Sequence, residues 1–479
     1  MSKQRILIAL AIGLIATSAA AVATFNFGEF RDKQLDAHSE QLFGIVSPVD
    51  ASSTESISGA EANADPTRLV TLAKGLHARV VSSRAELPSN IDMMALWPTN
   101  NPTHLIACNE QGTADPGLVR VRLSDGAVQT ILTGVTSCDP VKATAWGTII
   151  FGEESGPTSS PATPGGHLLE VINPLNTTGV NFNRVTGILS GTDAGNIATR
   201  PAVGRLSFEG LALLPNGVLY YGDENRPAAT TAGGAYYKFI PTTPYTGSNP
   251  ITNLSQSPLV AGSVFGLRLG KNGTAPGADN GQGTNTGMGT WIAVPNSNNA
   301  NLRAAAATLH LTGYYRPEDA EIDPVAFSIG KVRFCGNNTG NEDTDHTWGE
   351  TICVTDGFYA TVTSNSASPE VQYLVLGTSD FAMMDNLAFQ PIRGNWVIHE
   401  DGDAPGRATN AHNNDLWSCL DDGDDADNQS DGCARIGTLN DLEAEWTGGL
   451  FDAGGNHFYV SVQHNITGHG VILDIYGWR

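Results

Sequence analysis

A hairpin-like pattern recurs along the chain, and the first residue of most copies is one that can bind a metal ion. The clearest copy runs from Glu209 to Glu224: an apolar strand, a turn at Pro215 to Gly217 and a second apolar strand that ends in acid. Six copies can be identified, and their first residues are Asp92, Asp139, Glu209, Glu318, Asp385 and Thr447. If the repeat winds around an axis, these positions converge and five carboxylates meet at one place.

Five carboxylates gathered away from water repel one another strongly, and bound cations offset that repulsion. Carboxylate oxygens favour Ca²⁺, Mg²⁺, Mn²⁺ or ferric iron over a zinc site made mainly of thiolates. Each acid taken alone could equally end a strand and accept turn hydrogen bonds, but the set favours a metal site. Further acids end the second strand of the hairpins and are either ligands, supports or loop residues: Glu110, Glu153, Glu154, Asp223, Glu224, Glu400 and Asp401.

Arg316 lies two residues before Glu318, and alternate residues of an extended strand share a face. A guanidinium beside a metal cluster is suited to gripping an anionic oxygen of phosphate. The alternative is an ordinary salt bridge from Arg316 to Glu318 or Asp319. Motifs of other chemistries, such as a nucleophile elbow, a phosphate-binding P-loop or a zinc His-Glu-x-x-His, do not occur in the sequence.

The elements that must position these residues are the hairpins themselves. Six similar hairpins joined by spacers rich in Gly, Asn and Thr predict an all-β fold, a six-bladed β-propeller over residues 86–479. Uneven spacing between the copies predicts long loop insertions, above all at residues 247–305 and 401–439. In a propeller, the residue that opens each innermost strand points at one mouth of the central channel.

The N-terminus has the features of a secretory signal over residues 1–23: Lys3 and Arg5, an apolar stretch and then Ala21-Val-Ala23. An uncleaved membrane anchor is the alternative. Residues 24–85 are predicted to be a flexible leader and approach to the propeller, because much of this stretch is rich in Ser, Ala, Glu and Asp. The protein is therefore expected to be exported, to the periplasm or the cell exterior.

The formal net charge of -23 argues against nucleic acid or an anionic lipid surface as a partner, and it suits bound cations. The chain has 6 Cys, an even number in an exported protein, so disulfides are expected. Two local pairs are plausible and a third would remain: Cys419 with Cys433, Cys335 with Cys353, and Cys108 with Cys138.

Several stretches resemble, in the same order, motifs of the PhoX-type alkaline phosphatases. They are Ala-Trp-Gly-Thr-Ile-Ile-Phe-Gly-Glu-Glu at 145–154, Gly-Arg-Leu-Ser-Phe-Glu-Gly at 204–210, Arg-Pro-Glu-Asp at 316–319, Met-Asp-Asn-Leu-Ala-Phe at 384–389, and Glu-Trp-Thr-Gly at 445–448 through Val-Gln-His at 462–464. The resemblance covers nearly all of residues 86–479. It implies a six-bladed propeller that holds iron and calcium and hydrolyses a small phosphorylated substrate. By motif, Glu209 and Glu318 match the iron-binding glutamates of the family, and Arg316 matches its phosphate-binding arginine.

One departure from the family pattern concerns a metal ligand. The family has a cysteine seven residues before the Trp of the Trp-Gly-Thr motif, where this chain has Asp139, with Cys138 one step earlier. One step along a strand turns a side chain to the opposite face. Either a bulge returns Cys138 to the cluster, or Asp139 replaces it and Cys138 pairs with Cys108. An oxygen-only site would bind different metals from those of the family and need not be a phosphatase.

The predicted site thus has Arg316 as the catalytic residue and a larger set of metal ligands. The ligand set is Asp92, Cys138, Asp139, Glu153, Glu154, Glu209, Glu318 and Asp385. Three functions compete: a metal-dependent phosphomonoesterase, which is favoured; another calcium-dependent hydrolase, lactonase-like or phosphodiester-cleaving; and a non-catalytic calcium-binding propeller whose insertions carry the function.

Overall fold

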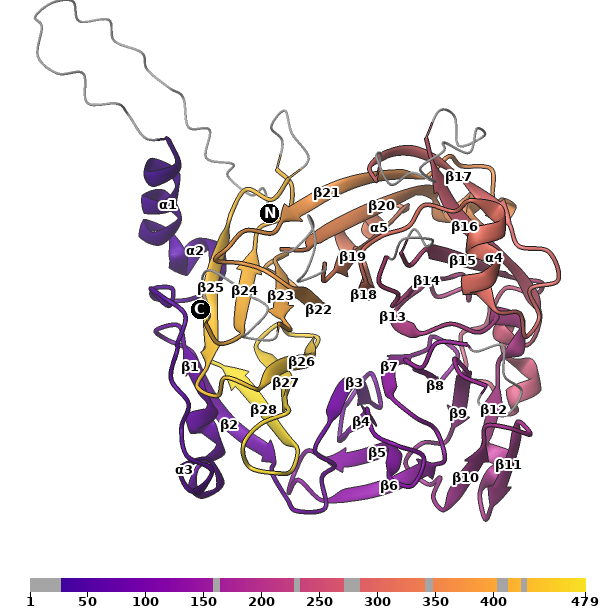
Figure 1. Cartoon of the computed structure of the whole chain (residues 1–479), viewed down its shortest axis with the longest axis horizontal. Helices are drawn as coiled ribbons and strands as arrows, with labels where there is room; N and C mark the ends of the chain where they lie inside the picture. The colour runs from indigo at the N-terminus through magenta and orange to yellow at the C-terminus, as the bar shows by residue number, and fades with distance from the viewer. Residues whose placement is uncertain are drawn as a thin grey trace, which may run out of the picture.

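The computed structural model describes residues 27–157, 164–227, 233–270, 285–340, 348–402, 412–423 and 429–479. The predicted signal peptide lies outside these residues. Within them the protein consists mostly of β-strands, as predicted, and Figure 1 shows the sheets arranged in a ring around a central space. Among the residues described, no helix has the length and apolar character needed to cross a membrane.

Six strands lie nearest the centre of the ring (Figure 1) and correspond to the first strands of the six hairpins. They are β3 (Ile91–Trp97), β7 (Cys138–Ala143), β13 (Phe208–Leu213), β18 (Pro317–Ile322), β22 (Met384–Phe389) and β26 (Glu445–Phe451). Each inner strand contacts the next one in this order, and β26 contacts β3. The contacts between inner strands therefore close on themselves around the centre.

Each inner strand begins a sheet that extends outwards. One sheet runs β3, β4 (His104–Asn109), β5 (Pro116–Arg122), β6 (Val128–Thr133), β10 (Val180–Asn183) and β11 (Ile188–Gly191). The next runs β7, β8 (Thr148–Glu153), β9 (Leu168–Ile172) and β12 (Ile197–Thr199). Another runs β22, β23 (Trp396–Glu400), β24 (Asp415–Cys419), β25 (Cys433–Leu439) and β1 (Val70–Leu72), and a fourth runs β26, β27 (His457–Gln463), β28 (Val471–Tyr476) and β2 (His77–Ser82).

The remaining sheet is longer and has an inner strand at each end. It runs β13, β14 (Leu219–Asp223), β15 (Tyr236–Pro241), β16 (Gly262–Leu269), β17 (Gly287–Ala293), β21 (Glu370–Leu376), β20 (Glu350–Phe358), β19 (Lys331–Asn338) and β18. Its two halves meet where β17 pairs with β21 through only Gly287 with Val371 and Met288 with Glu370. Two radial groups of strands are thus joined at their outer edges.

Helices are few and lie outside the ring of inner strands. The α-helices are α1 (Phe27–Ala37), α2 (Ser39–Phe43), α3 (Gly59–Ala64), α4 (Leu302–Leu309) and α5 (Pro324–Ser328). Short 3₁₀ helices occupy Pro66–Leu69, Ala194–Asn196, Pro201–Val203, Leu254–Gln256, Pro258–Val260 and Tyr359–Ser364. Figure 1 shows α1, α2 and α3 beside the sheets that contain β1 and β2, near the C-terminus.

The segment that precedes the ring is packed against it, which differs from the predicted flexible leader. β1 pairs with β25 and β2 pairs with β28, so both N-terminal strands complete sheets built from the C-terminal part of the chain. Phe43 and Ile45 are fully buried in the same apolar cluster as Val460 and Leu473. Composition missed this because a few well-placed apolar side chains, each stabilising by about 1.5–3 kcal/mol when buried, suffice to order the segment.

The predicted insertions also contain regular structure. β16, β17 and α4 fall within residues 247–305, and β24 and β25 fall within residues 401–439. The stretches that flank these strands are rich in Gly, Asn and Asp, which hides the strands in a reading of the sequence. The three predicted cysteine pairs are all present as disulfides: Cys108 with Cys138, Cys335 with Cys353, and Cys419 with Cys433.

Packing of the N-terminal segment should be measurable in stability. Replacing the fully buried Phe43 with alanine removes its apolar contacts and leaves a cavity, so the free energy of unfolding should fall by about 3–5 kcal/mol. Chemical denaturation would measure this change. Ile392→Ala is the matched control, because the Ile392 side chain is 83% exposed and should change stability little. Equal effects of the two substitutions would contradict a packed N-terminal segment.

Candidate metal centre

The five predicted carboxylates occupy the same place in their respective strands. Asp92, Asp139, Glu209, Glu318 and Asp385 are each the second residue of an inner strand. In all five strands the register with the neighbouring strand shifts at this point, for example between Ile91 and Met94 and between Phe208 and Leu211. Such β-bulges re-aim a side chain. All five side chains line one central cavity, as the repeat predicted.

The central cavity has a volume of about 540 Å³ and is strongly acidic. Besides those five residues, Glu110, Glu154, Asp401, Glu443 and Glu445 line it, which makes ten carboxylates. Arg316 and His464 are the basic residues among its described lining. A cavity with this excess of negative charge is suited to cations and not to a neutral ligand.

Burial and mutual repulsion raise the pKa values of these acids. Burial raises the pKa of Asp139 to about 7 and that of Glu318 to about 8. The pKa values of Asp92, Glu209 and Asp385 also rise well above the ordinary range, first because of burial and then because other carboxylates lie close by. Without cations these groups must hold protons, and with cations they can ionise.

The geometry of the acids fits a bound cation. One oxygen each of Glu209, Glu318 and Asp385 lies within 4.8 Å of the others. Ligand oxygens around one Ca²⁺ lie about 2.3–2.6 Å from the ion, so three at this mutual distance can share it. Asp92 Oδ1 and Asp139 Oδ2 are buried with no hydrogen-bond partner. Buried acceptors are normally satisfied, and a cation in the cavity would satisfy these two.

Arg316 lies at the edge of the acidic cluster, just before β18. Its Nε donates to Glu224 Oε1 at 2.8 Å, and its Nη2 lies 3.2 Å from Glu318 Oε1 and 3.9 Å from Asp401 Oδ2. The side chain is largely buried yet lines the central cavity. Of the two expected salt-bridge partners, Glu318 is a partner, whereas the Asp319 carboxylate accepts from the N–H groups of Ala320 and Leu387. The guanidinium is therefore held in place and presented to the cavity.

Two predicted ligands are not brought to the cavity. Cys138 forms a disulfide with Cys108, so its sulfur is not available to a metal, and Asp139 occupies the cavity position. Glu153 lies on the other side of its strand from Glu154, because successive residues point to opposite faces. The Glu153 carboxylate pairs with Arg184 Nε at 2.6 Å and with His167 Nδ1 at 2.7 Å. The metal-ligand interpretation of Cys138 and Glu153 is therefore wrong for this structure.

The remaining second-strand acids divide by the same alternation. Glu110, Glu154 and Asp401 line the central cavity, and Glu224 holds Arg316. Asp223 instead accepts two hydrogen bonds from Arg303, at 2.8 and 2.7 Å.

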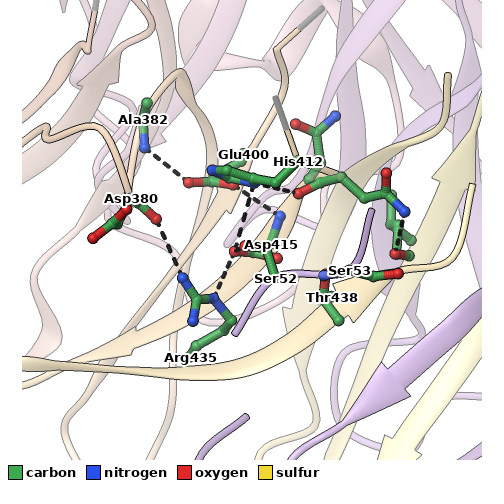
Figure 2. Close-up of polar contacts among 12 residues, drawn as sticks. Ser52, Ser53, Asp380, Ala382, Glu400, His412, Asp415, Arg435 and Thr438 are labelled. Carbon is green, nitrogen blue, oxygen red and sulfur yellow. Dashed lines mark hydrogen bonds and ion pairs between the residues drawn. The ribbon is translucent and has the colours of Figure 1, made fainter. Parts of the chain in front are cut away.

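Glu400 belongs to a second buried cluster with His412 and Asp415 (Figure 2), in which one ligand atom from each lies within 4.8 Å of the others. Glu400 accepts from the N–H groups of Ala382 and Asp415, at 2.8 and 2.9 Å. Figure 2 shows Arg435 directed at Asp415, to which its Nε donates at 2.6 Å. Arg435 thus supplies one positive charge to this cluster, beside the Asp415 carboxylate.

The sixth strand departs from the pattern of the other five. In β26 the register shift begins at Thr447, so Gly448 takes the position that an acid has elsewhere. A Cβ at Gly448 would lie 2.2 Å from the carbonyl oxygen of Asp92, so no larger residue fits between β26 and β3. Glu445 supplies a carboxylate to the cavity instead. Sequence reasoning missed Glu445, although it lies two residues before Thr447 and so on the same face.

Fold and site together define a mostly β-strand protein with a buried carboxylate cluster at the centre of a ring of sheets. A family model described as alkaline phosphatase PhoX matches residues 117–465, and the chain therefore belongs to the PhoX alkaline phosphatase family. The predicted family is confirmed.

The fold of the chain is similar to that of a solved structure. The structure of Pseudomonas fluorescens PhoX in complex with vanadate, a transition state analogue, matches with a TM-score of 0.61 and 14% identity, over 89% of this chain and 97% of that one. A PQQ-bound aldose sugar dehydrogenase from Streptomyces coelicolor matches with a TM-score of 0.40 and 11% identity, over 85% of this chain and 99% of that one. No curated protein sequence matches the chain.

The assignment of Asp139, and not Cys138, as the residue that faces the cavity can be tested by elemental analysis. Asp139→Asn should reduce the bound metal per protein, because a buried carboxylate of the cluster is lost. The Cys108→Ser, Cys138→Ser double variant should keep its metal and lose about 2–4 kcal/mol of stability, since only a disulfide is removed. Metal lost from the serine variant and retained in Asp139→Asn would contradict this assignment.

Proposed function

We propose that the chain is an exported, metal-dependent phosphatase that hydrolyses phosphomonoesters in the central cavity of a six-bladed β-propeller. The observation that carries this proposal is the position of Arg316. Its guanidinium lies beside Glu318, at the edge of a buried carboxylate cluster that fits cations. Metal ions together with a fixed guanidinium are the groups that phosphoryl transfer requires.

The propeller interpretation rests on the closed ring of contacts in which each of the six inner strands touches the next. Each of them begins a radial group of at least four strands. The nine-stranded sheet counts as two blades, because β17 and β21 join its halves through only two residue pairs. Pairing of β2 with β28 joins the N-terminal part of the chain to the last blade and so completes the ring.

Most of the metal ligands would come from the inner strands. Glu209, Glu318 and Asp385 form the closest set, and Asp92, Asp139 and Glu154 lie around them. Oxygen donors of this kind suit calcium, and ferric iron also accepts carboxylates. The family resemblance implies both metals, whereas the disulfide at Cys138 removes the thiolate that would favour iron most. When bound, the metal ions would neutralise phosphate oxygens and supply an activated nucleophile.

The residues of the chain bind and orient the substrate. Arg316 presents a planar fork of N–H groups that matches two oxygens of a phosphate. Glu224 and Glu318 hold this guanidinium from two sides, so little side-chain freedom is lost when phosphate binds. The cavity volume of about 540 Å³ suits a small phosphorylated molecule. The net charge of -23 disfavours nucleic acid as a substrate.

Two further features support the proposal. The relative from Pseudomonas fluorescens was solved with vanadate, a transition state analogue, which is consistent with phosphate chemistry in this family. Three disulfides are typical of a protein that folds outside the reducing cytoplasm. A non-catalytic calcium-binding propeller is the second candidate, because the ion pairs of Arg316 with Glu224 and Glu318 could also serve only to neutralise charge.

Substitution of Arg316 separates these candidates. Arg316→Ala should lower kcat/KM for an aryl phosphate by about 10²–10³-fold, the typical cost of losing one preorganised donor in a transition state. Arg316→Lys should restore only part of the activity, because lysine keeps the charge but not the fork. Arg122→Ala, which alters an exposed arginine of β5, is the control.

Steady-state kinetics on the calcium-loaded and the iron-plus-calcium-loaded protein would make the measurement. Full activity in Arg316→Ala would remove its proposed role. Absence of turnover in both loaded forms of the wild type would favour the non-catalytic propeller. Turnover of a lactone or a phosphodiester, with none of the monoester, would favour one of the other hydrolases.

Metal removal should make stability depend on pH in a defined direction. In the metal-free protein the pKa of Glu318 is raised from 4.5 to about 8 and that of Asp139 from 3.8 to about 7. A raised carboxyl pKa means that the folded state binds more protons than the unfolded state, so stability falls as pH rises between about 4 and 8. Thermal unfolding of chelator-treated protein should therefore occur at a lower temperature at pH 8 than at pH 5. Calcium should restore much of the loss, and an unchanged melting temperature with and without chelator would contradict metal binding.

A further inference from the structure

A second cavity, also of about 540 Å³, is basic although the whole chain is acidic. It lies at the sheet formed by β7, β8, β9 and β12. Its lining includes the polar side chains of His167, Arg184, Arg200, Arg205, Asn298 and Asn299. Concentrated positive charge in a protein with a net charge of -23 is unexpected unless it has a role.

The basic cavity lies at the same end of the strands as the acidic one. Gly152 at the end of β8 pairs with Leu168 at the start of β9, and Leu169 pairs with Thr199 at the end of β12. This is the end at which β7 begins and at which Cys138 pairs with Glu153.

Glu154 lines the acidic cavity, whereas its neighbour Glu153 pairs with Arg184 and His167 of the basic one. The two cavities therefore lie on opposite sides of one strand end.

Two of the three arginines are held in fixed positions by buried carboxylates. Arg184 Nε donates to Glu153 at 2.6 Å, and Arg200 Nε donates to Glu170 at 2.5 Å. Glu170 also accepts from Trp146 Nε1 at 2.6 Å and from Ser257 Oγ at 2.7 Å. These ion pairs orient the guanidinium groups, and each pair has no net charge.

Arg205 supplies the positive charge that is not balanced. Among the described residues, no carboxylate lies within ion-pair distance of its guanidinium, and its Nε is buried without a hydrogen-bond partner. A buried donor left unsatisfied is costly, more so when it is charged. Three arginines face two carboxylates here, so the arginines leave one positive charge that no carboxylate balances. Arg205 belongs to the Gly-Arg stretch at 204–210, which the proposed phosphatase site uses only through Glu209.

We propose that the basic cavity binds an oxyanion, the phosphate or carboxylate group of a small molecule, with Arg205 as its principal ligand. Guanidinium groups bind such groups through paired N–H donors, and the Asn298 and Asn299 amides offer further donors. The group can come from two sources: a free oxyanion such as inorganic phosphate, or a second anionic group on the substrate of the neighbouring acidic cavity. Only the second source rests on the proposed phosphatase function.

Titration calorimetry with inorganic phosphate tests the site without requiring any activity. Besides the phosphate bound at the proposed metal centre, the metal-loaded protein should show a second class of phosphate sites, which Arg205→Ala weakens by about tenfold or more, the effect of losing a charged hydrogen bond. Arg205→Lys should weaken it less. Arg122→Ala removes one positive charge from an exposed position elsewhere and should leave binding unchanged. Melting temperatures near that of the wild type would show that the variants are folded.

Phosphate binding that is identical in wild type, Arg205→Ala and Arg122→Ala would overturn the proposal. If Arg205→Ala weakens phosphate binding, kinetics identify the source. A KM that rises for a bisphosphate and not for an aryl monophosphate assigns the cavity to a second anionic group of the substrate. Unchanged KM values for both assign it to a free oxyanion.

Discussion

The repulsion between buried carboxylates is the constraint on which the rest of this structure depends. Five acids from five inner strands, joined by others from neighbouring strands, surround a space of a few hundred cubic ångströms. In water such groups would separate, and in the folded protein the closed ring of inner strands prevents separation. The repulsion can be relieved by protons or by cations. The first solution inactivates the carboxylates as ligands, and the second makes a metal centre, so the pKa values and the proposed chemistry have the same origin.

The fold meets this constraint with a local device that is repeated around the ring. A register shift after the second residue of each inner strand turns an acid towards the axis while the rest of the strand keeps its regular pairing. Stability comes from elsewhere: from the apolar faces of neighbouring sheets and from β1 and β2, which bind the N-terminal segment to the C-terminal sheets. The cost of gathering the charges is therefore offset by parts of the molecule that do not touch the site.

Much of this arrangement could be predicted from the sequence, because the acids recur at one position of a repeat. Five acids lie where the repeat predicted them: Asp92, Asp139, Glu209, Glu318 and Asp385. Prediction from the sequence failed where one residue along a strand decides which side of the sheet a side chain faces. Glu153 and Glu154 differ only in the side of the strand that they face, and the sequence does not show which of them faces the cavity.

The sixth strand shows the same limitation in another form. Its acid could not be found from the repeat, because Gly448 passes too close to Asp92 to be replaced and Glu445 substitutes from a different register. The N-terminal segment was misjudged because composition averages over residues, whereas Phe43 and Ile45 act individually.

The pair Cys138 and Asp139 links the chemistry of the site to the place where the protein folds. The Cys138 sulfur is held in a disulfide at the start of β7, and the Asp139 carboxylate takes the place beside the other acids. A disulfide forms in an oxidising compartment, and an oxygen-only ligand set selects hard cations such as calcium, which are available there. Both features of this one dipeptide therefore support the proposal that a metal centre is assembled after export, when the ring has closed and the acids have been brought together.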